Sequence, residues 1–316
     1  MAVVADDTGP SMDPAAVPEA GAPPAADDRP RWKRTLTLVI HNRLALFGMI
    51  TLGVLIIVAL TDRWLAPYGF NAVNVPDQLL PPSLDHPFGT DNLGRDVLSR
   101  VLLGAKVSLQ VGIIAVGLSL TVGTAIGVLA GYFGGRLDDA LMRSMDVLFA
   151  FPAILMAIAV LAVLGPGTTN AMVAIGIVYT PIFARVARAS SLSVRQAIYV
   201  RAARSAGASD LRIMRLHILP NIAAPIIVQA SISLAFAILA EAALSFLGLG
   251  TQAPNPSWGR MLSEGREFIQ QAWWMALFPG LAIFVTVLAF NVLGDGLRDA
   301  LDPRQASAIE ARGAKT

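Results

Sequence analysis

The chain has 316 residues and a net charge of only +2, and 55% of its residues are hydrophobic against 15% charged. Its mean hydropathy is +0.61. Ordinary soluble domains carry roughly a quarter charged residues, so this composition predicts a multi-pass membrane protein. The absence of cysteine excludes disulfides, thiolate metal sites and cysteine nucleophiles.

Residues 1–30 have the composition of a tail that does not fold. They hold six prolines and six acidic residues among many alanines. Such a segment buries too little apolar area to offset the entropy of ordering, so we expect a disordered cytoplasmic tail. It also lacks the basic start and apolar core of a signal peptide. At the other end of the chain, we expect residues 304–316 to form a flexible tail.

Six stretches of the chain are suited to cross a bilayer, which takes about 20 mostly apolar residues. We expect residues 31–106 to hold the first span and a long outer loop, and residues 107–303 to form a core of five spans. The sequence therefore predicts an all-α integral membrane protein with six transmembrane helices. The predicted spans are 44–61, 107–131, 147–165, 170–187, 222–247 and 275–294.

The basic residues indicate how these spans are oriented. With the N-terminus inside, 18 Lys and Arg residues lie on the cytoplasmic side and 6 on the outer side. This asymmetry follows the positive-inside rule and predicts that both termini are cytoplasmic. Because the positive charge flanks the spans, we attribute it mainly to membrane insertion, and we expect no nucleic acid partner. Four tryptophans fall near the outer ends of spans, where we expect interfacial anchors: Trp64, Trp258, Trp273 and Trp274.

The outer loop before the second span ends in a polar run, His86 to Asp96. Its acids and histidine have the spacing of neither a calcium loop nor a zinc pair, so we favour a structural role over a metal site. We expect Thr90 or Asp91 to cap an amphipathic helix on the membrane surface. The polar face of this expected helix holds Arg95, Ser99 and Arg100, and its apolar face holds Val97, Leu98, Val101 and Leu102.

The second span carries three glycines at intervals of four residues, Gly123, Gly127 and Gly131. This spacing places them on one helix face, where the missing side chains permit close approach of another helix. We interpret this face as a helix-packing surface and not as a substrate contact.

The polar segment 199–221 lies between two spans and has an order that a simple connecting loop does not need. Small residues, Ala202 and Ala203, follow Arg201, and Gly207 comes six residues after it. We expect Gly207 to take the left-handed conformation between two short helices. Leu219 and Pro220 end the unit, since proline is tolerated in the first turn of the next helix.

Glu241 lies within the fifth span, where an acid is by default a functional hypothesis. At 1.5 Å per residue, however, it lies about 28 Å along this helix, near the outer interface. Two interpretations stay open: a structural role bonded to neighbouring groups, or a place in a substrate path together with Ser245. The following loop, 248–274, contains a proline-rich turn and is either a lid on the outer face or an anchor for helix ends.

Segment 199–221 resembles the EAA coupling loop of ABC importer permeases. That pattern is Glu-Ala-Ala, three residues, Gly, nine residues, Ile-x-Leu-Pro. Here Arg201 stands at the Glu position and His217 at the first Ile position. The resemblance implies that a set of residues in this loop couples the chain to an ATPase: Arg201, Ala202, Ala203, Ser205, Gly207, Asp210, Leu219 and Pro220.

Most of the chain, from Arg43 to Arg304, resembles the C-type permease subunit of dipeptide and oligopeptide importers. The blocks that carry this likeness are Asn42 to Leu46, His86 to Leu103, Glu241 to Gly259 and Phe278 to Pro303. The family implies a plasma (inner) membrane complex with a B-type permease, two ABC ATPases that bind ATP and Mg, and an extracytoplasmic binding protein. Because nickel importers share this subunit type, the resemblance leaves nickel or another small solute open as an alternative cargo.

Enzyme chemistry is not expected from this chain. Its three lysines, Lys33, Lys106 and Lys315, each follow a residue other than glycine, so there is no Walker A loop. We expect no cofactor and no metal to be bound by the chain itself, and ATP hydrolysis to belong to partner subunits. The rival from another class is a secondary transporter or a channel, which usually has broken helices and charged residues at the membrane midplane.

Overall fold

The computed structural model describes residues 31–301, except for the side chains of residues 31–35 and 63. Within this range the chain forms helices and no strand. The predicted tails, 1–30 and 304–316, lie outside the described residues. The α-helices are α1 (Arg31–His41), α2 (Arg43–Leu65), α3 (Val97–Phe133), α4 (Gly135–Phe149), α5 (Ala153–Leu164), α6 (Thr168–Val194), α7 (Ile198–Ser205), α8 (Asp210–Ile213), α9 (Leu219–Phe246), α10 (Trp258–Gly265) and α11 (Trp274–Leu301).

Three shorter turns complete the described elements. Two are 3₁₀ turns, η1 (Val75–Asp77) and η3 (Arg266–Phe268). The third, η2 (Met214–Ile218), is a π-helical turn between α8 and α9.

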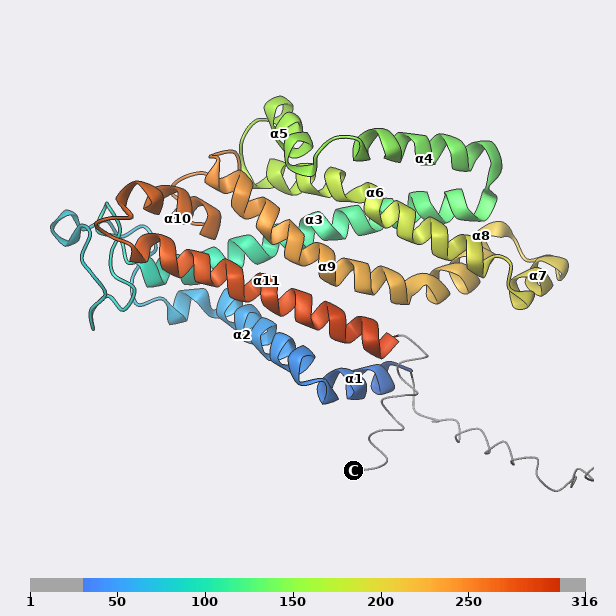
Figure 1. Cartoon of the computed structure of the whole chain (residues 1–316), viewed down its shortest axis with the longest axis horizontal. Helices are drawn as coiled ribbons and strands as arrows, with labels where there is room; N and C mark the ends of the chain where they lie inside the picture. The colour runs from blue at the N-terminus through green and yellow to red at the C-terminus, as the bar shows by residue number, and fades with distance from the viewer. Residues whose placement is uncertain (1–30, 302–316) are drawn as a thin grey trace, which may run out of the picture.

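The long helices form a bundle in which α3 and α9 are central (Figure 1). On one side, α2 and α11 pack together; on the other, α6 packs along α3, with α4 and α5 outside it. Two apolar clusters hold the bundle: one joins α3, α5, α6 and α9, and the other joins α2, α3, α9, α10 and α11. The loop 66–96 and α10 lie at one end of the bundle, and α7 lies at the other.

Five described helices are long and apolar enough to cross a membrane: α2, α3, α6, the α8–α9 helix and α11. They contain the first, second, fourth, fifth and sixth predicted spans. The helix that contains the second predicted span, 107–131, is longer than this span, because α3 starts at Val97. The charges of Arg100 and Lys106 shortened the apolar window, yet the helix continues through them without a break. The boundary drawn at 106–107 therefore falls inside a helix.

The third predicted span, 147–165, is not one helix. It breaks between α4 and α5, whose axes differ by 92°. Pro152 caps α5, and a residue before proline avoids the α conformation, so Phe151 cannot continue α4. Helix α5 has only 12 residues, about 18 Å, which is too short to cross a bilayer alone. By length and composition, the described residues therefore contain five candidate spans, or six if α4 and α5 together form one bent span.

The glycine face of α3 packs directly against α6, as its spacing predicts. A Cβ atom on Gly127 would lie 2.2 Å from the Ala184 carbonyl oxygen, and one on Gly123 would lie 2.5 Å from the Thr180 carbonyl oxygen. The third glycine, Gly131, meets Arg188 and Ser191 in the same way. The two helices therefore touch backbone to backbone along more than two turns.

The start and the end of the described chain lie close to each other. Leu38 and Val39 of α1 pack with Ala45 of α2 and Ala300 of α11 in a small apolar cluster. This cluster lies toward the half of the bundle that carries α7 (Figure 1).

Candidate functional site

Helix α7 ends in a complete Schellman motif, which explains the glycine in segment 199–221. The amide of Ala208 donates to the Ala203 carbonyl over 3.1 Å, and the amide of Gly207 donates to the Arg204 carbonyl over 3.0 Å. Gly207 has φ = +81°, the left-handed conformation that the sequence predicts. No atom lies within 4 Å of a Cβ placed there, so the preference for glycine comes from the backbone conformation alone.

Pro220 lies in the first turn of α9, as the sequence predicts, but Leu219 and Pro220 do not end the helical segment that precedes them. The chain runs as one helix from Asp210 to Phe246. A π-helical turn precedes the proline, and the Leu219 amide donates to the Met214 carbonyl, five residues back. The wider turn makes room for a ring that lacks an N–H. Asn221 Nδ2 donates to the His217 carbonyl over 2.7 Å, so this side chain folds back onto the π-helical turn.

Most of the predicted coupling residues face outward. Seven of the eight are exposed, namely Arg201, Ala202, Ser205, Gly207, Asp210, Leu219 and Pro220. The exception is Ala203, which is half-buried and packs on the main apolar cluster. Val200 and Ile213 are buried in the same cluster and fix α7 and α8 to the bundle. On the outer face of α7, Ile198 is 76% exposed and Tyr199 is also exposed.

An open, polar cleft of about 790 Å³ lies between α7 and the end of α3. Arg201 and Arg204 line it. The Tyr132 hydroxyl donates to Asp210 over 2.6 Å, and the Arg204 guanidinium lies 5.2 Å above the Tyr132 ring. Contact with Tyr132, reinforced by the charge of Asp210, raises the pKa of Arg204, which therefore stays positive. Arg195 donates to the last carbonyls of α3, those of Gly131 and Tyr132.

Glu241 is almost fully buried, with 1% exposure, and its carboxylate is held by hydroxyl groups. Ser245 donates to it over 2.7 Å and Ser108 of α3 over 3.1 Å, and the Thr251 hydroxyl lies 3.5 Å away. Ser245 in turn accepts from the Thr251 amide over 2.9 Å. The carboxylate therefore joins α3, α9 and the loop after α9. A cavity of about 720 Å³ opens at this end of the bundle, and neither Glu241 nor Ser245 lines it.

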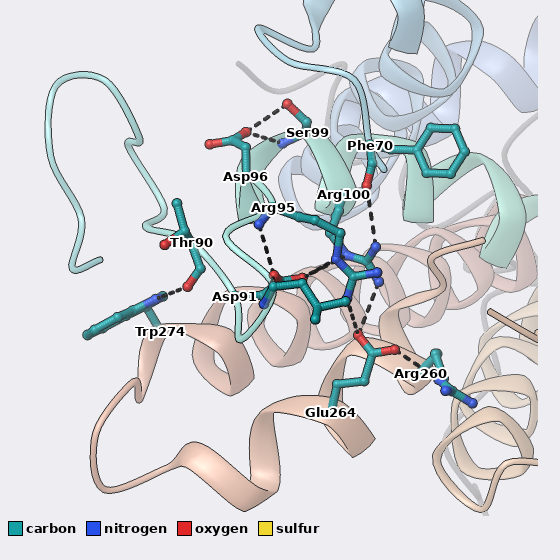
Figure 2. A network of polar contacts seen from close by, with 11 residues as sticks. Phe70, Thr90, Asp91, Arg95, Asp96, Ser99, Arg100, Arg260, Glu264 and Trp274 are labelled. Carbon is teal, nitrogen blue, oxygen red and sulfur yellow. Dashed lines mark hydrogen bonds and ion pairs between the residues drawn. The ribbon is translucent and has the colours of Figure 1, made fainter. Parts of the chain in front are cut away.

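Sequence reasoning missed a buried ionic network at the same end (Figure 2). We expected Arg95, Ser99 and Arg100 on the polar face of a surface helix, but all three are buried. Arg95 Nε contacts Asp91 over 2.6 Å, and Arg100, only 1% exposed, contacts Glu264 of α10 over 3.1 Å. Arg100 also donates to the Phe70 carbonyl. Four charged groups thus fasten the loop before α3 and the start of α3 to α10, and Glu264, more than 160 residues from both arginines, left no local signal of this contact.

The predicted cap of this helix was also wrong. Asp96 caps α3, because its carboxylate accepts the Ser99 amide over 2.7 Å. Asp91 instead accepts the amides of Leu93 and Arg95 and orders the loop. The Thr90 hydroxyl accepts the Leu80 amide over 2.8 Å.

Two of the four outer tryptophans belong to the core and are not interfacial anchors. Trp258 Nε1 donates to the Val101 carbonyl over 3.0 Å, and Trp274 Nε1 donates to the Thr90 carbonyl over 3.0 Å. Both side chains are buried, whereas Trp64 and Trp273 are exposed. Segment 248–274 therefore packs firmly on α3, α9 and α11. Among the described residues, no group of three or more His, Asp or Glu side chains is arranged to hold a metal ion.

Comparison with known proteins gives consistent matches. Residues 123–307 match the family described as binding-protein-dependent transport system inner membrane component, and residues 31–82 match the N-terminal TM domain of oligopeptide transport permease C. The dipeptide transport system permease protein DppC of Alkalihalophilus pseudofirmus is 46% identical, over 93% of this chain and 98% of that protein. The glutathione transport system permease protein GsiD of Escherichia coli is 48% identical, over 86% of this chain and 89% of that protein.

A solved structure of the MetNI methionine ABC transporter in an inward-facing conformation is similar in fold. Its TM-score is 0.53 at 17% identity, and the match covers 64% of this chain and 96% of that chain. At this identity the likeness concerns the fold alone.

Proposed function

This chain belongs to the family of binding-protein-dependent transport system inner membrane components, and from that premise we propose that it is one of two permease subunits of an ATP-driven importer of short peptides. It is a multi-pass protein of the bacterial inner membrane. The observation that carries the proposal is the outward-facing helix–Gly–helix element 198–213, held on the bundle by buried Val200 and Ile213.

We propose six spans, with α4 and α5 together forming the bent third one, and both termini in the cytoplasm. The distribution of Lys and Arg supports this orientation, because seven arginines lie between residues 185 and 215. It places α7 at the cytoplasmic end of the bundle and the loop 66–96 at the outer end (Figure 1).

In this proposal α7 is the contact with the ATPases. Its exposed Ile198 and Tyr199 supply apolar contact area, and the exposed Arg201 beside them supplies positive charge. The small side chain of Ala202 and the lack of one at Gly207 leave room for a close fit. Closure of the ATPase pair on ATP pushes this element and shifts the bundle between inward and outward openings. ATP and Mg are bound by the ATPase subunits, and this chain has no ATPase activity of its own.

The partners follow from the same premise. They are a second permease of the B type, two ABC ATPases and an extracytoplasmic substrate-binding protein. We propose that the outer surface built by loop 66–96 and α10 receives the binding protein, because the buried network of Figure 2 makes it rigid. Of the two interpretations of Glu241, we propose the structural one, since its hydroxyl partners hold the outer ends of three segments together.

We propose peptides as the cargo because the relatives at 45–48% identity are named for dipeptide, peptide or glutathione transport. The test is reconstitution of the chain with its B-type permease, ATPases and binding protein in liposomes. We expect ATP-dependent uptake of radiolabelled di- and tripeptides and ATP hydrolysis stimulated by the loaded binding protein. Uptake of chelated nickel without peptide uptake would assign the alternative cargo, and uptake without the ATPases would assign a secondary transporter.

A further inference from the structure

The cavity of about 720 Å³ opens at the outer end of the bundle, away from α7. Its walls come from the end of α2, the first part of α3, the start of α6 and the loop after α9. Small-molecule sites have volumes of roughly 300–1,000 Å³, so a short peptide fits. The polar lining includes Asp62, Lys106, Gln110, Thr168, Thr169 and Asn255.

The wall formed by α3 changes character along its length. Lys106 and Gln110, one helical turn apart, are exposed into this cavity. The next exposed residues on α3 are Ile113 and Ile114. An ionisable side chain in a membrane helix faces a protein interior or a water-filled cavity, because exposure to lipid is costly. The polar end of this face therefore belongs to an aqueous space and not to the lipid.

The ammonium of Lys106 is only partly engaged. Its Nζ lies 3.5 Å from Oδ1 of Asp62, a weak contact, and the Lys106 side chain is 44% exposed while that of Asp62 is 4% exposed. An ammonium has three donors, so donors of Lys106 are free to bind a second acceptor in the cavity. A carboxylate is the acceptor that gains most from such a donor, because both partners are charged.

We propose that this cavity is the outer vestibule in which the peptide is received, and that Lys106 binds the carboxylate of the peptide. Gln110, Thr168 and Asn255 offer hydrogen-bonding groups to the amides of the peptide backbone. The inference rests on the proposed function and deepens it, because it assigns one substrate group to one residue of this chain.

A purely structural alternative exists, in which Lys106 only neutralises the buried Asp62. The two roles respond differently to a second substitution. If Lys106 serves Asp62 alone, Asp62→Asn restores transport to the Lys106→Met variant. If Lys106 serves the substrate, transport by the double variant stays low.

The absence of cysteine from the chain permits a direct test. Lys106→Cys in the reconstituted complex is treated with 2-aminoethyl, methyl or 2-sulfonatoethyl methanethiosulfonate, which restore the positive charge, leave none or reverse it. We expect Lys106→Cys to reduce peptide uptake roughly tenfold, the loss typical for one hydrogen bond to a charged group. The aminoethyl reagent should restore uptake and the other two should not.

The controls are wild-type complex treated with the same reagents and Arg266→Cys, which removes an exposed cation on the same face outside the cavity. Peptide-loaded binding protein should slow modification of the thiol introduced by Lys106→Cys, whereas unloaded binding protein should not. Three results would each overturn the inference: uptake that is insensitive to the charge at this position, rescue by Asp62→Asn, or an introduced thiol that outer reagents cannot reach in the complex. Absence of peptide uptake by the wild-type complex would instead overturn the proposed function.

Discussion

The contact between α3 and α6 allows a prediction whose size follows from the structure. A Cβ on Gly127 would lie 2.2 Å from the Ala184 carbonyl oxygen and 2.8 Å from the Arg188 amide nitrogen. Both atoms belong to the α6 backbone, which cannot move aside as a side chain does. Gly127→Ala therefore forces the two helices apart locally, and overpacking of this kind costs about 1–3 kcal/mol.

Gly117 provides a matched control on the same helix, because no atom lies within 4 Å of a Cβ placed there. Replacing glycine with alanine in a helix gains about 0.8–1.0 kcal/mol in propensity. Gly117→Ala should therefore be neutral or stabilising, whereas Gly127→Ala should be less stable than Gly117→Ala by about 1–3 kcal/mol, because both variants gain the same helix propensity.

The measurement is the thermal midpoint of the purified complex, followed by tryptophan fluorescence. We expect a lower midpoint for Gly127→Ala and an unchanged or higher one for Gly117→Ala. Equal midpoints for the two variants would refute the close contact of α3 with α6.

Three further predictions concern the two ends of the bundle. Glu264→Gln should lower stability by about 2–3 kcal/mol in the same assay, because two buried arginines lose a charged partner; a variant as stable as wild type would contradict the role of the network. Ser83→Cys should react with a membrane-impermeant thiol reagent in intact cells, and Ser209→Cys only after permeabilisation; outside labelling at residue 209 would overturn the six-span topology. Ala203→Asp should lower the thermal midpoint of the subunit, because Ala203 packs on the core. Ala202→Asp should leave the thermal midpoint unchanged but abolish peptide-stimulated ATP hydrolysis. The reverse pattern would contradict the orientation of α7.

The local features of the fold could be predicted well from the sequence. Hydropathy located the long helices, the four-residue spacing of Gly127 and its neighbours indicated a packing face, and Gly207 indicated a left-handed turn. Each of these signals comes from residues within a few helical turns of one another, so regular backbone geometry is enough to interpret it.

Several of the features that sequence reasoning missed depend on contacts between distant segments. Arg100 looks like a polar surface residue until Glu264, 164 residues later, is seen beside it. Burial of Trp258 and Trp274 likewise reflects partners more than 150 residues away. Two misses were local instead, because hydropathy averages over the break before Pro152 and over the π-helical turn before Pro220.

The central claim is that segment 199–221 couples ATP binding and hydrolysis by the ATPases to movement of the membrane helices. Substitution of Gly207 tests this claim most directly. Gly207→Val places a β-branched residue at φ = +81°, at a cost of about 1–3 kcal/mol. Gly207→Asn is the matched control, because asparagine tolerates this conformation. The position is exposed and sterically open, so both variants should assemble with the ATPases.

The decisive measurement is peptide uptake and ATP hydrolysis by each reconstituted variant at equal subunit stoichiometry. We expect Gly207→Val to lose peptide uptake and peptide-stimulated ATP hydrolysis together, and Gly207→Asn to retain most of both. Transport by an assembled Gly207→Val complex at the wild-type rate would contradict the central claim.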